Sequence, residues 1–160
     1  MRKICLLALP LAIACGGSDS NTTTYVAQMN AANEKPAANS SPATGTATFT
    51  VDSTQTTVNF VVTYTGLSAG STLSHIHAGT ADVAGQVSVP FPQLVTGKTA
   101  DTFSGSFTSA QVGAATGGTI TIAKGDLAGL INAMKAGNAY AQVHSSANPG
   151  GEIRGQIHPQ

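Results

Sequence analysis

The chain has 160 residues, a length that fits one domain with a single hydrophobic core. Seven Lys and Arg residues balance seven Asp and Glu residues, and a processed chain without Arg2 and Lys3 would carry five basic against seven acidic side chains, a net charge of −2. Because nucleic-acid affinity depends on many basic contacts to phosphates, we expect no nucleic-acid partner. The low aromatic content of 5% and the 18 glycines favour short strands joined by turns.

The first 14 residues have the order of a secretory signal peptide. A basic pair is followed by an apolar stretch over residues 4–13 and by a small residue before Cys15. This stretch is too short to span a bilayer, which needs about 20 residues. The arrangement resembles a bacterial lipoprotein signal, and the resemblance implies that Cys15 is acylated after cleavage. We therefore expect an exported protein of the cell envelope, in the outer membrane or facing the periplasm, that contacts the membrane through a lipid anchor only.

A flexible linker, with the lipidated Cys15 at its start, is expected over residues 15–23. Its Gly, Ser, Asn and Thr residues cannot bury enough apolar surface to fold. Residues 24–160 are the predicted domain. Cys5 would leave with the signal peptide and Cys15 would carry lipid, so packing without a disulfide must hold this domain together.

Strands dominate the predicted domain, because apolar and polar residues alternate in most of its segments. Pro90 and Pro92 interrupt one segment, which predicts an edge strand, and residues 113–118 are predicted to be turns. Asp126, apolar residues at helical spacing and Gly137 predict one short helix over residues 126–135. The predicted strands cover residues 46–51, 57–64, 73–78, 87–94, 102–108, 119–123, 139–144 and 152–158.

Many short strands with frequent turns and no longer repeat predict an all-β fold. We expect an antiparallel Greek-key β-sandwich or a flattened barrel with one short helix. Hydrolase machinery is not visible, because no serine has the flanking glycines of a nucleophile elbow and no carboxylates are paired in one motif. Tyr25, Tyr64 and Tyr140 are interpreted as packing residues.

Histidines are the side chains that suggest chemistry. The strand period of two places His75 and His77 on one face, about 6.5–7 Å apart along the backbone. If Val143 faces the core, His144 faces away from it, and the last strand likewise turns Glu152 and Arg154 outward. If these three strands are neighbours in one sheet, the histidines and Arg154 emerge on the same side.

Two interpretations of this cluster stay open. Three neutral imidazoles can bind copper or zinc, with Glu152 and Arg154 pairing with or supporting the ligands. The same groups can instead form a hydrogen-bonded network that fixes the strands without an ion.

Several segments are those of a known family. The chain resembles a CHRD domain, the module named for the repeats of chordin, over about residues 25–158. The family's biochemical role is poorly defined, and the binding of signalling factors by its animal members does not transfer to a single bacterial copy. The matching segments are residues 32–36, 45–49, 64–67, 74–79, 139–145 and 148–157.

The order of the histidines is also similar to that of the copper/zinc superoxide dismutases. This resemblance implies that His75, His77 and His144 are copper ligands and that Arg154 guides an anion. The bridging histidine, the zinc ligands and the disulfide of that family have no counterpart. We therefore expect a binding module rather than a copper-dependent redox enzyme. The other alternative is an extracellular structural, adhesion or protein-binding module.

Overall fold

A computed structural model describes residues 22–160 of the chain. The predicted signal peptide, Cys15 and the predicted linker up to residue 21 lie outside the described residues. Within residues 22–160, none of the helices is long and apolar enough to cross a membrane.

Strands make up most of the described chain. Eight of them form one sheet in the order β5-β4-β9-β10-β1-β2-β3-β6, and β7 and β8 form a separate hairpin. The helices are α1 (Leu127–Lys135) and the short 3-10 helices η1 (Ala31–Asn33) and η2 (Ser109–Gln111). The strands are β1 (Thr23–Asn30), β2 (Thr44–Val51), β3 (Val58–Thr65), β4 (Ser71–Ala78), β5 (Val87–Pro90), β6 (Asp101–Phe107), β7 (Ala115–Gly117), β8 (Ile120–Ile122), β9 (Ala139–Ser145) and β10 (Ile153–Pro159).

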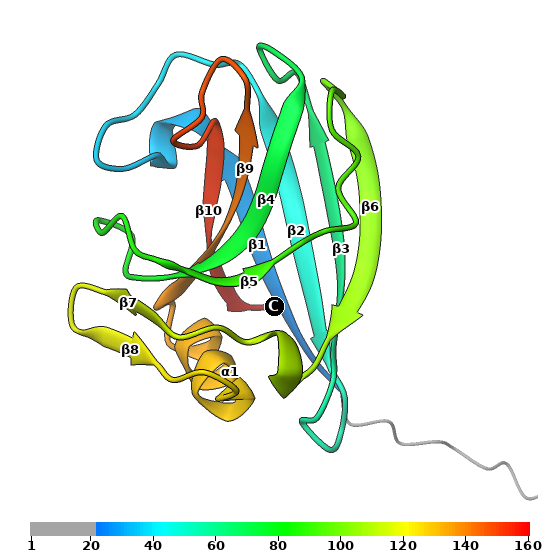
Figure 1. Ribbon diagram of the computed structural model, residues 1–160, viewed down its shortest axis with the longest axis vertical. Helices are drawn as coiled ribbons and strands as arrows, with labels where there is room; N and C mark the ends of the chain where they lie inside the picture. The colour runs from blue at the N-terminus through cyan, green and yellow to red at the C-terminus, as the bar shows by residue number, and fades with distance from the viewer. Residues whose placement is uncertain (1–21) are drawn as a thin grey trace, which may run out of the picture.

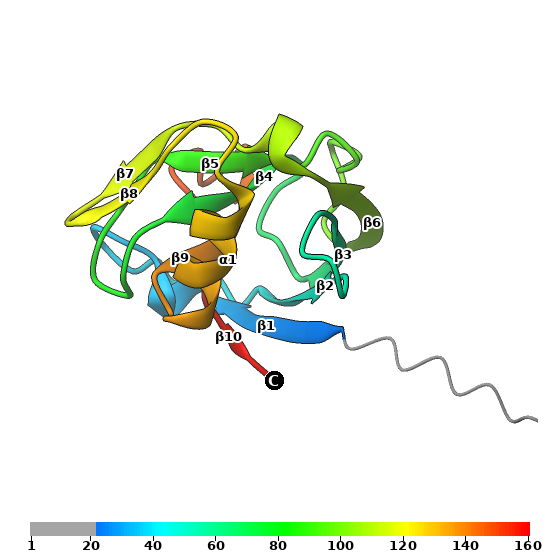
Figure 2. The same cartoon turned by 90° about the horizontal axis from the view of Figure 1, so that it is seen from below.

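The large sheet is antiparallel at every pairing and curls around its own apolar face (Figures 1 and 2). Strands far apart in the chain become neighbours, with β9 beside β4 and β10 beside β1. Such crossovers are those of Greek-key connections. The predicted all-β class with one short α-helix is therefore confirmed.

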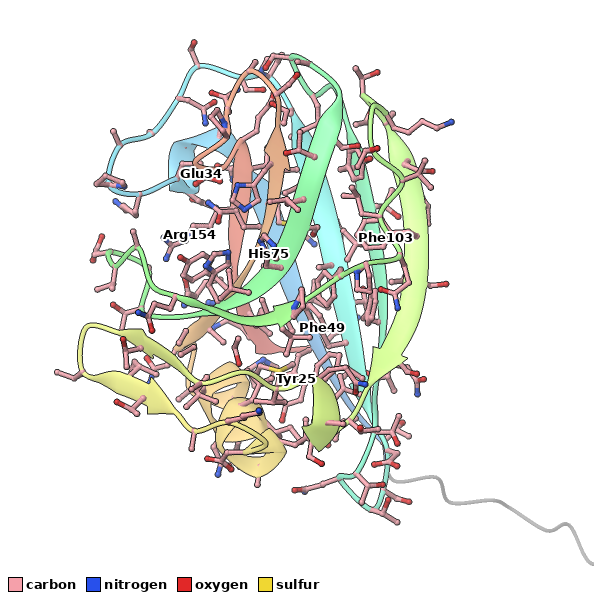
Figure 3. All side chains as sticks on the ribbon, in the orientation of Figure 1. Tyr25, Glu34, Phe49, His75, Phe103 and Arg154 are labelled. Atoms are coloured by element: carbon pink, nitrogen blue, oxygen red, sulfur yellow. The ribbon has the colours of Figure 1, made fainter. Side chains whose placement is uncertain are left out.

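The core lies inside the curl. Burial alternates residue by residue along β3, as the alternation of its sequence predicts. Phe60 of β3 stacks on Phe91 at a centroid distance of 4.3 Å, and Phe103 of β6 packs edge-on against Phe60 at 6.2 Å. Each buried phenylalanine contributes about 1.5–3 kcal/mol relative to an exposed one. Figure 3 shows Phe49 and Phe103 within this apolar half of the molecule.

Helix α1 covers one end of the curl, where Figure 2 shows it from below. Asp126 caps its N-terminus, because its carboxylate accepts a hydrogen bond from the backbone N–H of Gly129 at 2.8 Å. Leu130 and Met134 are fully buried against the sheet. The predicted helix is confirmed, and so is Asp126 as its N-cap.

Two sequence predictions need correction. The predicted strand over residues 87–94 ends at Pro90, because the two prolines provide no backbone N–H for the ladder and the chain turns after them. Residues 113–118 are not only turns, because β7 lies among them and pairs with β8. Position 117 of this strand requires a glycine, because a Cβ there would collide with the carbonyl of Ala78.

The polar face of β4, β9 and β10 is covered by two loops, one running from η1 to residue 43 and the other over residues 79–86 (Figure 1). The Nδ2 of Asn33 donates to the carbonyl of Arg154 at 3.1 Å and so ties the first loop to β10. In the second loop, the backbone of Gly85 bonds to the hydroxyl of Tyr140 on β9. Polar side chains on this face are therefore buried although they point away from the core.

Candidate metal centre

Neighbouring strands supply the three predicted histidines. In the register of β4 and β9, His75 lies opposite Gln142, His77 opposite Tyr140, and Leu73 opposite His144. The condition on which the sequence argument depended is met, because β4, β9 and β10 are consecutive in the sheet. The three histidines therefore share one face.

Their rings form a compact, buried cluster. One ring nitrogen from each lies within 4.8 Å of the others. His75 is 9% exposed, His77 6% and His144 7%. The rings of His75 and His144 meet edge to face at 5.1 Å, and those of His75 and His77 do so at 5.4 Å.

Backbone carbonyls set the tautomers of two of these rings. The Nδ1 of His77 lies 3.0 Å from the carbonyl oxygen of Gly85, and the Nδ1 of His144 lies 3.0 Å from that of Pro149. A carbonyl oxygen only accepts, so each Nδ1 carries the hydrogen and each Nε2 keeps a free lone pair. The Nε2 of His77 is buried and has no hydrogen-bond partner.

His75 completes the arrangement. Its Nδ1 lies 3.3 Å from the Nε2 of His144. Because that Nε2 has no hydrogen, the Nδ1–H of His75 donates the hydrogen bond. A shift of that proton to the Nε2 of His75, which gives the other neutral tautomer, would leave one lone pair of each ring available to the cluster.

Burial keeps all three rings uncharged at neutral pH. Burial, with the neighbouring His144, lowers the pKa of His75 to about 4. Burial also lowers the pKa of His77 to about 4, against the hydrogen bond to Gly85. It lowers the pKa of His144 as well. Neutral imidazole is the form that binds a metal ion.

The spacing of His75 and His144 fits an ion, and one nitrogen of His77 lies within 4.8 Å of them. A zinc ion bound at about 2.0–2.1 Å by two imidazole nitrogens in tetrahedral geometry brings those nitrogens to about 3.3 Å from each other. His75 and His144 already have this separation. Carbonyls behind the Nδ1–H groups of His77 and His144 are the kind of outer support that orients metal-binding histidines.

Arg154 reaches the cluster only through Tyr140. The ring of Tyr140 stacks on that of His77 at a centroid distance of 4.8 Å, with the planes 7° apart. The guanidinium carbon of Arg154 lies 3.4 Å from the centre of the same ring. Because β9 runs between β4 and β10, these two groups approach Tyr140 from opposite sides. Figure 3 shows Arg154 and His75 in the same half of the molecule.

Arg154 itself is 1% exposed. Its Nη2 donates to the carbonyl of Thr80 at 2.8 Å, and its Nη1 is buried without a partner. Among residues 22–160 the only ion pair joins Lys35 and Asp82, so no carboxylate pairs directly with this guanidinium.

Glu152 lies in a separate network. Its carboxylate accepts hydrogen bonds from the hydroxyl of Ser41 at 2.5 Å, from the backbone N–H of Ser68 at 2.6 Å, and from the hydroxyl of Ser145. Burial alone would raise the pKa of Glu152, but these hydrogen bonds lower it to about 2. The network joins three segments of the chain and includes none of the three histidines.

Glu34, Gln142 and Tyr140 are members of this face that the sequence argument did not assign to the site. The Nε2 of Gln142 donates to Glu34 at 2.5 Å. Burial raises the pKa of Glu34 to about 7, against the lowering effect of that hydrogen bond and of Arg154. The alternation in β9 that turns His144 away from the core also places Tyr140 and Gln142 on the same face as His144. Nothing local in the sequence indicates that Glu34 lies there.

Comparison with known proteins gives one match. The model of the CHRD domain family matches residues 25–157, nearly the whole described chain. No curated protein and no solved structure matches the chain. The likeness to copper/zinc superoxide dismutases therefore depends on the order of the histidines and Arg154 alone.

Proposed function

The chain belongs to the CHRD domain family, and we propose that it is a binding module that holds one copper or zinc ion between His75, His77 and His144. The observation that carries this proposal is the Nε2 of His77, which is buried and has no hydrogen-bond partner, in a ring that belongs to the three-histidine cluster. A buried acceptor without a partner costs about 1–3 kcal/mol. An ion at this position would remove that cost.

The test is a titration of the protein with copper and with zinc, followed by calorimetry and by thermal melting. Cys5→Ser and Cys15→Ser remove both thiols, so that no cysteine competes with the imidazoles for the ion. We expect one-to-one binding and a higher melting temperature with the ion. His77→Ala abolishes both, whereas His158→Ala, which removes an exposed histidine, leaves both unchanged. Failure of both copper and zinc to bind the parent protein would overturn the proposal.

A second candidate is a structural or protein-binding module. The three serine-derived hydrogen bonds to the buried Glu152 favour it, because they fix three segments without any ion. In that case His77→Ala lowers the melting temperature of the metal-free protein and metal has no effect on either protein. Loss of superoxide beyond that caused by free copper would instead place the domain among redox enzymes.

Export and lipid anchoring through Cys15 are proposed from the sequence pattern of residues 1–15. Mass spectrometry of the envelope fraction tests this. We expect a mature chain that begins with an acylated Cys15, and Cys15→Ser is expected to abolish membrane attachment. An unmodified chain in the cytoplasmic fraction would contradict both expectations.

A further inference from the structure

The candidate metal centre contains no ligand that could offset the charge of an ion. It consists of three imidazoles, with no carboxylate and no thiolate within the cluster of the described residues. All three rings are buried, and imidazole binds a metal ion in its neutral form. A bound ion would keep its full charge, which is one for copper(I) and two for copper(II) or zinc(II).

The charge nearest to the cluster is positive. Arg154 lies over the face of Tyr140, and the ring of Tyr140 stacks on His77. No carboxylate pairs with Arg154 among the described residues, whose one ion pair is that of Lys35 and Asp82.

The acidic side chains nearby are already bound elsewhere, and Asp82, whose charge acts on Arg154, pairs with Lys35. Glu152 accepts hydrogen bonds from Ser41, Ser68 and Ser145. Glu34 accepts one from Gln142, and its raised pKa leaves it partly uncharged near pH 7. Because Arg154 lies one ring away from this buried site, a bound ion with two positive charges costs more free energy than an ion with one.

The number of ligands points in the same direction. Zinc(II) takes four ligands, so three histidines would hold it only with a water molecule in the fourth position, and copper(II) prefers a tetragonal set of nitrogen and oxygen ligands. Copper(I), a closed-shell ion, accepts three. On the proposed function that these histidines hold an ion, we infer that the ion is copper(I), selected over copper(II) and zinc(II) by the neutral ligand set and the charge of Arg154.

The test measures three affinities for the protein with Cys5→Ser and Cys15→Ser. Copper(I), kept reduced with ascorbate, is titrated in competition with a chromophoric copper(I) chelator. Copper(II) and zinc(II) are titrated against chelators of their own. We expect copper(I) to bind at least about 100-fold more tightly than either divalent ion, a reversal of the usual advantage of copper(II) at nitrogen sites. Equal or tighter binding of a divalent ion overturns this inference and leaves the proposed function intact, whereas absence of all binding overturns both.

Two sets of variants test the role of charge. Arg154→Met removes the cation and Arg154→Lys keeps it, so Arg154→Met is expected to reduce the preference for copper(I) about tenfold. Because Arg154 is buried, a surface variant serves as the second test. Leu73 is 54% exposed and lies opposite His144, so Leu73→Glu places a negative charge beside the cluster, with Leu73→Gln as the matched control.

Leu73→Glu is expected to shift the preference toward the divalent ions, and Leu73→Gln to leave it unchanged. Identical preferences in both Leu73 variants would contradict the role assigned to charge.

Discussion

The hydroxyl of Tyr140 binds both backbone polar groups of Gly85, since it accepts from the N–H at 3.0 Å and donates to the carbonyl at 3.3 Å. The same carbonyl accepts the Nδ1–H of His77. Tyr140 therefore supports His77 in two ways, by stacking on its ring and by holding the carbonyl that sets its tautomer.

Tyr140→Phe and Tyr140→Leu separate these two contributions. Tyr140→Phe keeps the stacked ring and loses the hydroxyl, so we expect a loss of about 1 kcal/mol in the free energy of unfolding. Tyr140→Leu also loses the ring under His77 and Arg154, and the expected loss is about 3 kcal/mol. Urea unfolding of both variants measures the difference. Equal losses would mean that the stacking contributes nothing.

Gly85→Ala is expected to destabilise the protein by more than about 4 kcal/mol or to prevent folding. A Cβ at this position would collide with the carbonyl of Ala78, so the loop over residues 79–86 cannot stay where Gly85 meets His77 and Tyr140. Gly150→Ala is the matched control, because a Cβ there has no neighbour within 4 Å.

Gly150→Ala is expected to change the stability by less than about 0.5 kcal/mol. Thermal melting compares the two. A stable Gly85→Ala protein would show that the loop can move away at little cost.

The histidines make the metal-free protein sensitive to acid. The pKa of His75 and of His77 is about 4 in the folded chain, below the ordinary value of 6.5, so the unfolded chain takes up protons first as the pH falls. Their contribution to stability is complete above pH 6.5 and is lost as the pH falls toward 4. We expect a loss on the order of a few kcal/mol across this window. Urea unfolding at several pH values measures it, and His77→Ala should reduce the slope.

Glu34 acts with the opposite sign. Its pKa of about 7 lies above the ordinary value of 4.5, so its contribution is present below pH 4.5 and is lost as the pH rises through 7. Glu34→Gln keeps an acceptor for Gln142 and cannot ionise. We expect it to stabilise the protein by about 2–3 kcal/mol at pH 8 and to have little effect at pH 4.5. A stabilisation of the same size at both pH values would show that ionisation is not the cause.

Alternation was sufficient to predict most of the large sheet, although β1 (Thr23–Asn30) was not among the predicted strands. In β3 and β9 the small and apolar residues occur at every second position, and both strands lie where this period places them. Strand β7 was missed because Ala115–Gly117 is short and lies among glycines, and its partner β8 is what makes it a strand. Pairing with a second segment is a tertiary effect that no local pattern carries.

The sequence predicted the side chains of the site but not the backbone carbonyls that support them. The phase of His144 relative to Val143 correctly indicated a face shared with His75 and His77. Which strands would be neighbours was only a condition of that argument. The carbonyls of Gly85 and Pro149 come from loops whose paths depend on the packed fold, so no residue pattern marks them as hydrogen-bond acceptors.

The pairing of β4 with β9 determines when the three histidines can meet during folding. His75 and His144 are 69 positions apart in the chain, and they come within reach of each other only when these strands have paired. Closing so long a loop is slow relative to forming local turns. An unfolded or truncated chain presents at most the isolated pair of His75 and His77. The complete three-histidine cluster therefore exists only after β4 and β9 have paired, and a probe that requires all three rings distinguishes molecules with this pairing from molecules without it.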